Sequence, residues 1–252
     1  MTTNQIRIKS PGEIDILRKA GKILSSIIGE LKGSLTVGMT TRAIDARAEA
    51  LAKKHNVLPA FKGYRGFPAS TCISVNEGVV HGIPGGYVLK EGDIVSLDMG
   101  IIHDDYYSDT AVTVAIGCVA PEIRRLLDVA QASLYKGIEQ ARADNRLSDI
   151  SFAVQSYVQL HGFSVVRDFV GHGIGRQLHE DPEVPNYGPP HQGAVLKPGM
   201  VLAIEPMVNM GTYRTKILKD GWTVVTEDGK PSAHFEHCVV ITQQGPEILT
   251  KW

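Results

Sequence analysis

Residues 89–98 of the chain read Leu-Lys-Glu-Gly-Asp-Ile-Val-Ser-Leu-Asp, and residues 196–205 read Leu-Lys-Pro-Gly-Met-Val-Leu-Ala-Ile-Glu. Each stretch is a Leu-Lys-x-Gly turn followed by an apolar run typical of a β-strand. Each run ends on a carboxylate where another apolar residue would be expected. A second acid, Asp109 or Glu236, then precedes a further apolar run in each case. The repetition indicates two similar halves that place four acids in equivalent strand positions.

The order of the predicted elements repeats in the same way. Helical spacing and capping signals predict helices at residues 10–33, 40–54, 121–142 and 148–160. Apolar runs predict strands at residues 72–76, 94–101, 107–116, 164–169, 201–210 and 236–242. No low-complexity linker separates the two sets. We therefore expect one domain over residues 1–252, made of halves at about 10–117 and 118–252.

Composition narrows the class of protein. The 252 residues are 43% hydrophobic and 21% charged, which is ordinary for a globular protein, and a net charge of −1 does not favour nucleic-acid binding. The three cysteines form no CxxC pair, so we expect reduced thiols in a cytoplasmic protein. No stretch approaches the ~18 apolar residues of a membrane span. We expect no membrane association and no direct nucleic-acid function.

Asp98 and Asp109 are predicted to face each other across a hairpin. The midpoint between them falls at residues 103–104, in a polar stretch that suits a turn, so an antiparallel pair would hold their Cβ atoms about 5 Å apart. Buried carboxylates at that distance repel each other and lose hydration, which a cation between them relieves. Glu205 and Glu236 repeat the arrangement. A solvated strand face is the alternative for any single acid, but the duplicated set favours a metal.

A histidine narrows the choice of metal. Four carboxylates without a nearby thiolate suit a divalent ion, and an imidazole moves the preference from Ca²⁺ or Mg²⁺ toward Mn²⁺, Fe²⁺, Co²⁺ or Zn²⁺. His172 is the candidate, because its flanking glycines permit a close approach. Five such ligands suit two ions about 3.5–4 Å apart. His234 and His237 are expected to point away from Glu236 and not to join it.

At these residues the chain resembles the bacterial type I methionine aminopeptidases. The motifs that carry the resemblance are Ser-Thr-Cys-Ile-Ser-Val-Asn-Glu at 70–77, Val-His-Gly-Ile-Pro at 80–84, Gly-His-Gly-Ile-Gly at 171–175, His-Glu-Asp-Pro at 179–182, Ile-Glu-Pro-Met at 204–207 and Phe-Glu-His at 235–237. The resemblance implies the α+β pita-bread fold, in which helices cover one face of a curved antiparallel sheet and the halves are related by a pseudo-two-fold axis. It also implies removal of the N-terminal methionine of nascent peptides.

The family pattern implies a dinuclear centre of Co, Mn, Fe or Zn. Its ligands would be Asp98, Asp109, His172, Glu205 and Glu236. Of these, Asp109 and Glu236 would bridge the ions, His172 and Glu205 would hold one ion, and Asp98 would hold the other. The substrate's free α-amine would bind at the same centre, which restricts cleavage to the terminal residue.

The resemblance also implies the catalytic roles. A hydroxide between the ions would attack the scissile carbonyl, with Glu205 as general base. His179 would donate to the carbonyl oxygen as charge develops there. His81 would contact the amide nitrogen of the departing residue or help its protonation.

The pocket for the methionine side chain should be a narrow apolar slot with aromatic contacts to sulfur. The residues that match the family's pocket are Tyr64, Phe67, Cys72 and Trp222, joined by Phe61 and Leu178. Phe61 and Leu178 differ from the residues of well-known bacterial members. Ordinary core packing is the alternative for the aromatic side chains.

Two other functions are compatible with parts of this pattern. One is a pita-bread hydrolase that cuts before proline or acts on a small amidine, and the other is a binding module that has lost its metals. His179 and Glu205 are separated by 26 in sequence number, which leaves no space for the helical insert of type II enzymes. We expect a monomer. Arg214, Lys216 and Lys219 could form a transient ribosome contact, with a solvated basic hairpin as the alternative.

Overall fold

The computed structural model describes residues 6–252. Among these residues the α-helices are α1 (Pro11–Ser34), α2 (Thr41–Lys54), α3 (Pro121–Gln140) and α4 (Leu147–Leu160), and a 3₁₀ turn, η1, spans Tyr64–Gly66. The strands are β1 (Leu58–Pro59), β2 (Cys72–Val75), β3 (Gly78–Val80), β4 (Ile94–His103), β5 (Tyr106–Ala115), β6 (Ser164–Val165), β7 (Gly171–Gly173), β8 (Glu180–Val184), β9 (Val201–Ile204), β10 (Met207–Asn209), β11 (Thr215–Ile217), β12 (Val224–Thr226), β13 (Ser232–His234), β14 (His237–Thr242) and β15 (Gly245–Ile248).

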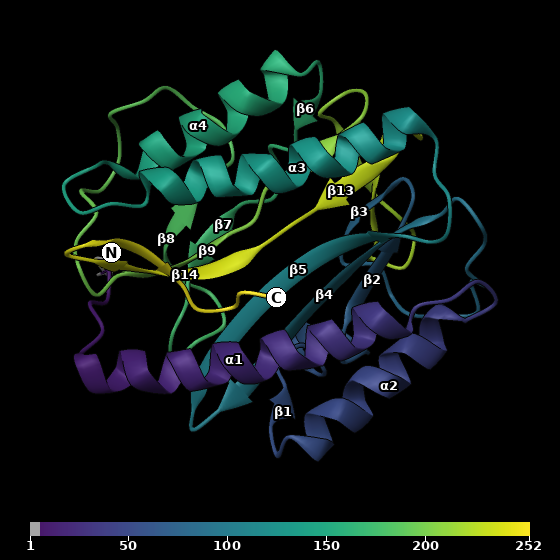
Figure 1. Cartoon of the computed structure of the whole chain (residues 1–252), viewed down its shortest axis with the longest axis horizontal. Helices are drawn as coiled ribbons and strands as arrows, with labels where there is room; N and C mark the ends of the chain where they lie inside the picture. The colour runs from purple at the N-terminus through teal and green to yellow at the C-terminus, as the bar shows by residue number, and fades with distance from the viewer. Residues whose placement is uncertain (1–5) are drawn as a thin grey trace.

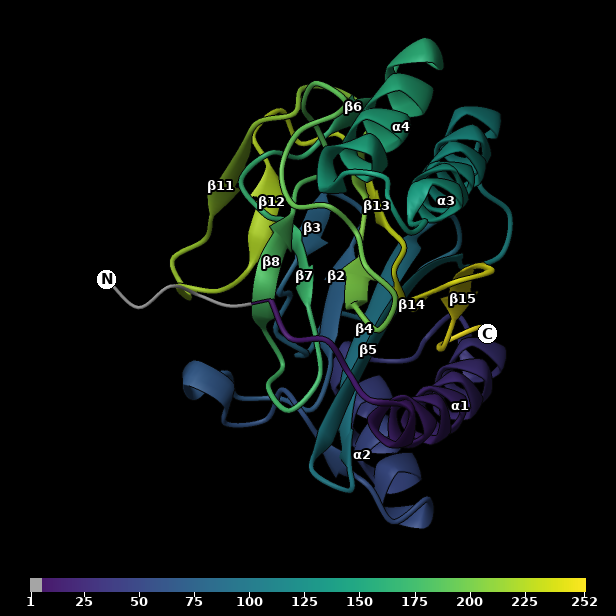
Figure 2. The same ribbon diagram turned by 90° about the vertical axis from the view of Figure 1, so that its left-hand side faces the viewer.

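Helix α1 begins where the sequence predicts. Ser10 and Glu13 form a reciprocal capping box, with Pro11 in the first turn. The apolar stripe of α1 packs against β4 and β5, while α3 packs against α4 and β13. In Figure 1, α1 and α2 lie below the long strands and α3 and α4 lie above them. The view in Figure 2 shows that α1 and α3 nevertheless cover the same face of β4, β5 and β14. The core lies between these helices and the strands.

The two Leu-Lys-x-Gly turns adopt the same conformation. Gly92 and Gly199 both have a φ of 89°, which glycine adopts without strain. The Gly92 N–H donates to the carbonyl of Ile116 at 2.9 Å, and the Gly199 N–H donates to that of Ile241 at 2.9 Å. The repeated sequence therefore folds as a repeated structure at these turns. The division of the chain into halves near Gly117 stays a prediction.

The β4–β5 hairpin has a different register from the one predicted. Asp98 lies opposite Ala111, and Asp109 lies opposite Gly100, so the two acids are diagonal neighbours and the direct pairing was wrong. The reason is the turn, since Asp104 and Asp105 form a two-residue connection with φ of 49° and 63°. A shift of two residues keeps both carboxylates on one face.

The strands predicted at 201–210 and 236–242 are interrupted. β9 ends at Ile204 and β10 begins at Met207, because Pro206 has no N–H for the ladder. Likewise β13 ends at His234 and β14 begins at His237. Glu205 and Glu236 thus lie in the breaks between strands, whereas Asp98 and Asp109 lie within strands. The strand predicted at 164–169 is only two residues long, Ser164–Val165.

All the strand pairs within residues 6–252 are antiparallel. The strands form hydrogen-bonded groups β1-β4-β2 with β5, β13-β10-β6, β11-β12-β3 and β15-β14-β9-β7-β8. In this part of the chain no helix has the length and apolar character needed to cross a bilayer.

Candidate metal centre

The β4–β5 hairpin contributes two acids from neighbouring strands. On β4, Asp98 lies opposite Cys72 of β2 and Ala111 of β5. Asp109 is two residues before Ala111 and therefore projects from the same face of β5. Cys72, Asp98 and Asp109 thus lie on one face of this sheet because of the strand register.

The segment around Glu236 is held against β5 by hydrogen bonds at Glu236 and Thr110. The Glu236 N–H donates to the carbonyl of Ala111 at 2.9 Å, and the Thr110 hydroxyl donates to the Glu236 carbonyl at 2.7 Å. The Cys238 thiol lies 3.2 Å from the carbonyl and 3.4 Å from the amide nitrogen of Asp109. These contacts bring the Asp109 and Glu236 side chains together.

Three of the predicted ligands converge closely. One ligand atom each of Asp109, His172 and Glu236 lies within 4.8 Å of the others, and all three side chains are buried. Glu205 lies beside them, with Oε1 3.5 Å from Nε2 of His172. One oxygen each of Asp98, Asp109 and Glu236 is buried without a hydrogen-bond partner among the described residues. Three orphaned carboxylate oxygens directed into one site need a cation.

The electrostatics of the site agree with this need. Burial raises the pKa of Asp98, Glu205 and Glu236 well above the usual carboxyl range, and the charge of Asp109 raises them further. Burial also raises the pKa of Asp109. Without a cation the protein must therefore hold protons on a group of facing carboxylates at neutral pH. A divalent cation would displace those protons.

His172 has the tautomer of a metal ligand. Its Nδ1 lies 2.9 Å from the carbonyl oxygen of Gly173, which can only accept, so Nδ1 carries the proton. Its Nε2 then offers a lone pair to the site. Burial lowers the pKa of His172 to about 4, which keeps the ring neutral. Backbone anchoring of the distal nitrogen is usual for histidine ligands. The residues present thus fit a site for hard or borderline divalent ions.

His81 and His179 lie at the edge of the acid cluster. His81 has a φ of 58°, an unusual backbone conformation for a non-glycine residue and one that recurs at functional sites. Burial lowers the pKa of His81. The pKa of His179 is also lowered, first by partial loss of hydration and then by neighbouring His172, whose ring centroid is 4.3 Å away. Both rings are therefore neutral at pH 7.

Every residue predicted for the site lines a single cavity of about 160 Å³. Part of its lining is polar and consists of the acids and histidines. The rest is mainly apolar and includes Phe61, Tyr64, Phe67, Cys72, Leu178 and Trp222. Phe67 meets Trp222 edge-on, with centroids 5.2 Å apart. The arrangement can hold an apolar side chain with its adjoining peptide bond at the acid cluster.

Sequence reasoning missed two residues. His234 is buried and its Nε2 lies 3.6 Å from Oε2 of Glu205, so the expectation that it points away was wrong. A step of two residues along a strand returns to the same face, and this spacing from Glu236 was the available signal. Arg65 lines the cavity, whereas His234 lies behind Glu205, and the place of Arg65 in a left-handed turn has no clear sequence signature. His237 does point away, toward Thr250 and Tyr135.

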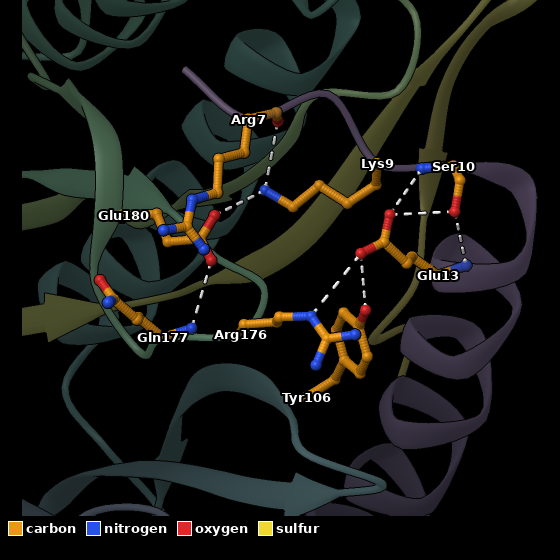
Figure 3. A network of polar contacts seen from close by, with 8 residues as sticks. All are labelled: Arg7, Lys9, Ser10, Glu13, Tyr106, Arg176, Gln177 and Glu180. Carbon is orange, nitrogen blue, oxygen red and sulfur yellow. Dashed lines mark hydrogen bonds and ion pairs between the residues drawn. The ribbon is translucent and has the colours of Figure 1, made fainter. Parts of the chain in front are cut away.

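A second, polar groove of about 960 Å³ shares His172 and His179 with the cavity. Figure 3 shows the contacts along its wall. Lys9 donates to Glu180 at 2.8 Å, and both side chains are almost fully buried. Glu180 also accepts from the backbone N–H of Gln177 at 3.2 Å. The segment before α1 is thus fastened to the loop that carries His179.

Comparison with known proteins agrees with this geometry. Residues 15–243 match metallopeptidase family M24. A methionine aminopeptidase of Clostridium perfringens is 57% identical over 245 residues, which cover 97% of this chain and 98% of that protein. The structure of a Thermotoga maritima methionine aminopeptidase matches with a TM-score of 0.97 and 47% identity, covering 98% of this chain and 100% of that one.

A prolidase of Pyrococcus furiosus has the same fold with a TM-score of 0.79 and 25% identity, and the match covers 97% of this chain but 65% of that chain. The predicted pita-bread fold is therefore confirmed. The chain belongs to metallopeptidase family M24, in which its close relatives are bacterial methionine aminopeptidases.

Proposed function

We propose that this hydrolase removes the initiator methionine from nascent proteins in the cytoplasm and prefers a small second residue. The observation that carries the proposal is the cavity itself, in which orphaned carboxylate oxygens and the Nε2 lone pair of His172 face an apolar slot. A slot lined by aromatic rings and a thiol suits the thioether of methionine. Relatives that carry the name methionine aminopeptidase support the same substrate.

Asp98, Asp109, His172, Glu205 and Glu236 would hold two divalent ions, with Asp109 and Glu236 shared between them. When bound, the ions supply Lewis acidity and lower the pKa of a water to about 7. Their identity among Co, Mn, Fe and Zn is set by supply as much as by ligand type.

The protein's own groups perform the remaining steps. Glu205 accepts a proton from the attacking water, a role suited to a carboxylate whose pKa is raised by burial. His179 donates an N–H to the carbonyl oxygen as negative charge develops there. His81 contacts the amide nitrogen, which must be protonated before the shortened peptide leaves. The apolar wall holds the methionine side chain so that only its own peptide bond reaches these groups.

A peptide assay separates this function from its rivals. We expect Met-Gly-Met-Met to be cleaved after the first residue in the presence of Co²⁺ or Mn²⁺, faster than Met-Leu or Xaa-Pro peptides. Faster cleavage of Xaa-Pro would identify a prolidase-like activity instead. Activity that does not respond to metal after chelation would contradict the metal-dependent mechanism. Glu205→Gln is the control, because it retains shape and loses the proton acceptor.

A transient ribosome contact stays a prediction. Arg214, Lys216 and Lys219 lie on or beside β11, which pairs with β12, and Arg214 lies 3.8 Å from Glu227. The three basic side chains would bind ribosomal phosphates by electrostatic attraction, without base contacts. Charge reversal of Lys216 and Lys219 should reduce co-sedimentation with ribosomes at low salt, and unchanged co-sedimentation would rule out this contact.

A further inference from the structure

The hydroxyl of Tyr64 lies 2.8 Å from Nδ1 of His179. Tyr64 belongs to the 3₁₀ turn η1, and His179 immediately precedes β8, so the contact joins two segments that are distant in the sequence. The two rings are tilted by 33°, with centroids 5.4 Å apart. Tyr64 is therefore a direct polar partner of the histidine as well as part of the wall of the cavity.

We propose that Tyr64 is a positioning residue that fixes His179 in its Nε2–H tautomer and thereby aims an N–H at the substrate carbonyl. A neutral imidazole carries one N–H, and a phenol can either donate or accept. If the hydroxyl donates to Nδ1, the ring proton must be on Nε2. If Nδ1 carried the proton, Nε2 could only accept and could not stabilise a carbonyl oxygen. The inference rests on the proposed function, which assigns that oxygen to His179.

The hydrogen bonds of Tyr64 favour the first arrangement. Among residues 6–252 its hydroxyl has no hydrogen-bond partner other than Nδ1 of His179. A phenolic O–H is a stronger donor than the N–H of a neutral imidazole, so donation from the hydroxyl to Nδ1 is the favoured direction. The Arg65 guanidinium lies 5.4 Å from the centroid of the Tyr64 ring, and its positive charge makes the phenol a better donor.

Tyr64→Phe is the direct test, because it keeps the ring in the cavity wall and removes only the hydroxyl. We expect kcat and kcat/KM for Met-Gly-Met-Met to fall together by about tenfold with little change in KM, since the lost effect acts in the transition state. A rise in KM at unchanged kcat would show a pocket-wall role and overturn the proposal. Tyr106→Phe is the matched control, because the Tyr106 hydroxyl donates to Glu13 at 2.6 Å and not to His179.

The tautomer can be read without activity. In ¹⁵N-histidine-labelled protein, recorded metal-free and loaded with diamagnetic Zn²⁺, wild type should show Nδ1 of His179 as an unprotonated nitrogen. His179→Gln identifies the signals. Tyr64→Phe should shift them toward a mixture of tautomers, and Tyr106→Phe should leave them unchanged. A protonated Nδ1 in wild type, or identical His179 signals in Tyr64→Phe, would overturn the proposal.

The two experiments keep the proposals apart. If wild type cleaves no methionyl peptide, the proposed function fails, yet the nitrogen signals still report whether Tyr64 sets the tautomer. If wild type is active and Tyr64→Phe is equally active with unchanged spectra, only the positioning role fails.

Discussion

The backbone N–H of Glu236 donates to the carbonyl oxygen of Ala111 at 2.9 Å. Ala111 is on the same face of β5 as Asp109, so this bond places the two proposed bridging carboxylates side by side. Thr110 adds a second bond, from its hydroxyl to the Glu236 carbonyl. The proposed metal centre therefore depends on a junction between β5 and the break that separates β13 from β14, and this junction holds two proposed ligands together before any ion binds.

The ligands should differ in their effect on metal content. Asp98→Asn should leave about one ion bound per chain, because Asp98 is proposed to hold a single ion. Glu236→Gln should lower occupancy of both positions, because a bridging oxygen serves both ions. Elemental analysis after gel filtration measures the stoichiometry. Two equivalents retained by Asp98→Asn would contradict the assignment.

The contribution of the buried carboxyl groups to the stability of the metal-free protein should fall as pH rises. The pKa values of Glu236, Asp98 and Glu205 are raised above those of the unfolded chain, so the folded state binds more protons. Their contribution is complete below about pH 4 and is lost as pH rises through the folded values. We expect the stability of chelated wild type, relative to chelated Glu236→Gln, to decrease from pH 5 to pH 8 in urea unfolding. A constant or growing difference would contradict the shifts.

His234 should support catalysis through Glu205. Its Nε2 lies 3.6 Å from the carboxylate of Glu205, a proposed metal ligand, and loss of an outer neighbour of a metal ligand typically costs 10–100-fold in activity or affinity. His234→Asn should therefore lower kcat/KM by about that factor. His237→Asn is the matched control, because this equally buried ring on β14 contacts Thr250 and not Glu205. Equal losses in both variants, normalised to folded protein, would refute a specific role.

The Lys9–Glu180 pair should matter more to stability than a surface ion pair. Both side chains are at most 5% exposed, so Lys9→Met leaves a buried carboxylate without its partner. Loss of one member of a buried pair costs about 3–5 kcal/mol. The double variant Lys9→Met/Glu180→Leu should recover part of this loss in denaturant unfolding. Additive losses in the double variant would show that the pair is not coupled.

The duplicated glycines provide a matched test of local packing. Alanine at Gly92 or Gly199 meets the same left-handed φ of 89°, which costs about 1 kcal/mol or more. At Gly199 the added Cβ would also lie 2.7 Å from Ile8 and 2.8 Å from the Lys9 carbonyl, whereas at Gly92 its nearest neighbour is 3.7 Å away. Gly199→Ala should therefore lower the melting temperature more than Gly92→Ala. The reverse order would contradict the packing.

The sequence was sufficient for the helices, and it proposed a set of site residues that the fold brings together. Capping signals place the start of α1 correctly, and each residue predicted for the site lines the one cavity. The helix starts follow from short-range capping rules. The site residues came from the repeated motif and from the resemblance to a known family, and their roles stay predictions.

The details that failed depend on backbone conformation. Two consecutive aspartates with positive φ move the centre of the β4–β5 turn, and no composition rule separates this turn from a neighbouring polar one. The interruption at Pro206 could have been expected from its missing N–H, and the place of His234 from its two-residue spacing to Glu236. The Tyr64–His179 contact joins distant segments and becomes visible only in three dimensions.

Crystals grown with Co²⁺ or Mn²⁺ and measured at the absorption edge of the metal provide the most direct test. We predict two anomalous peaks about 3.5–4 Å apart, both in contact with Asp109 and Glu236, with Asp98 beside one and His172 beside the other. A single peak, or peaks away from these five side chains, would contradict the dinuclear centre.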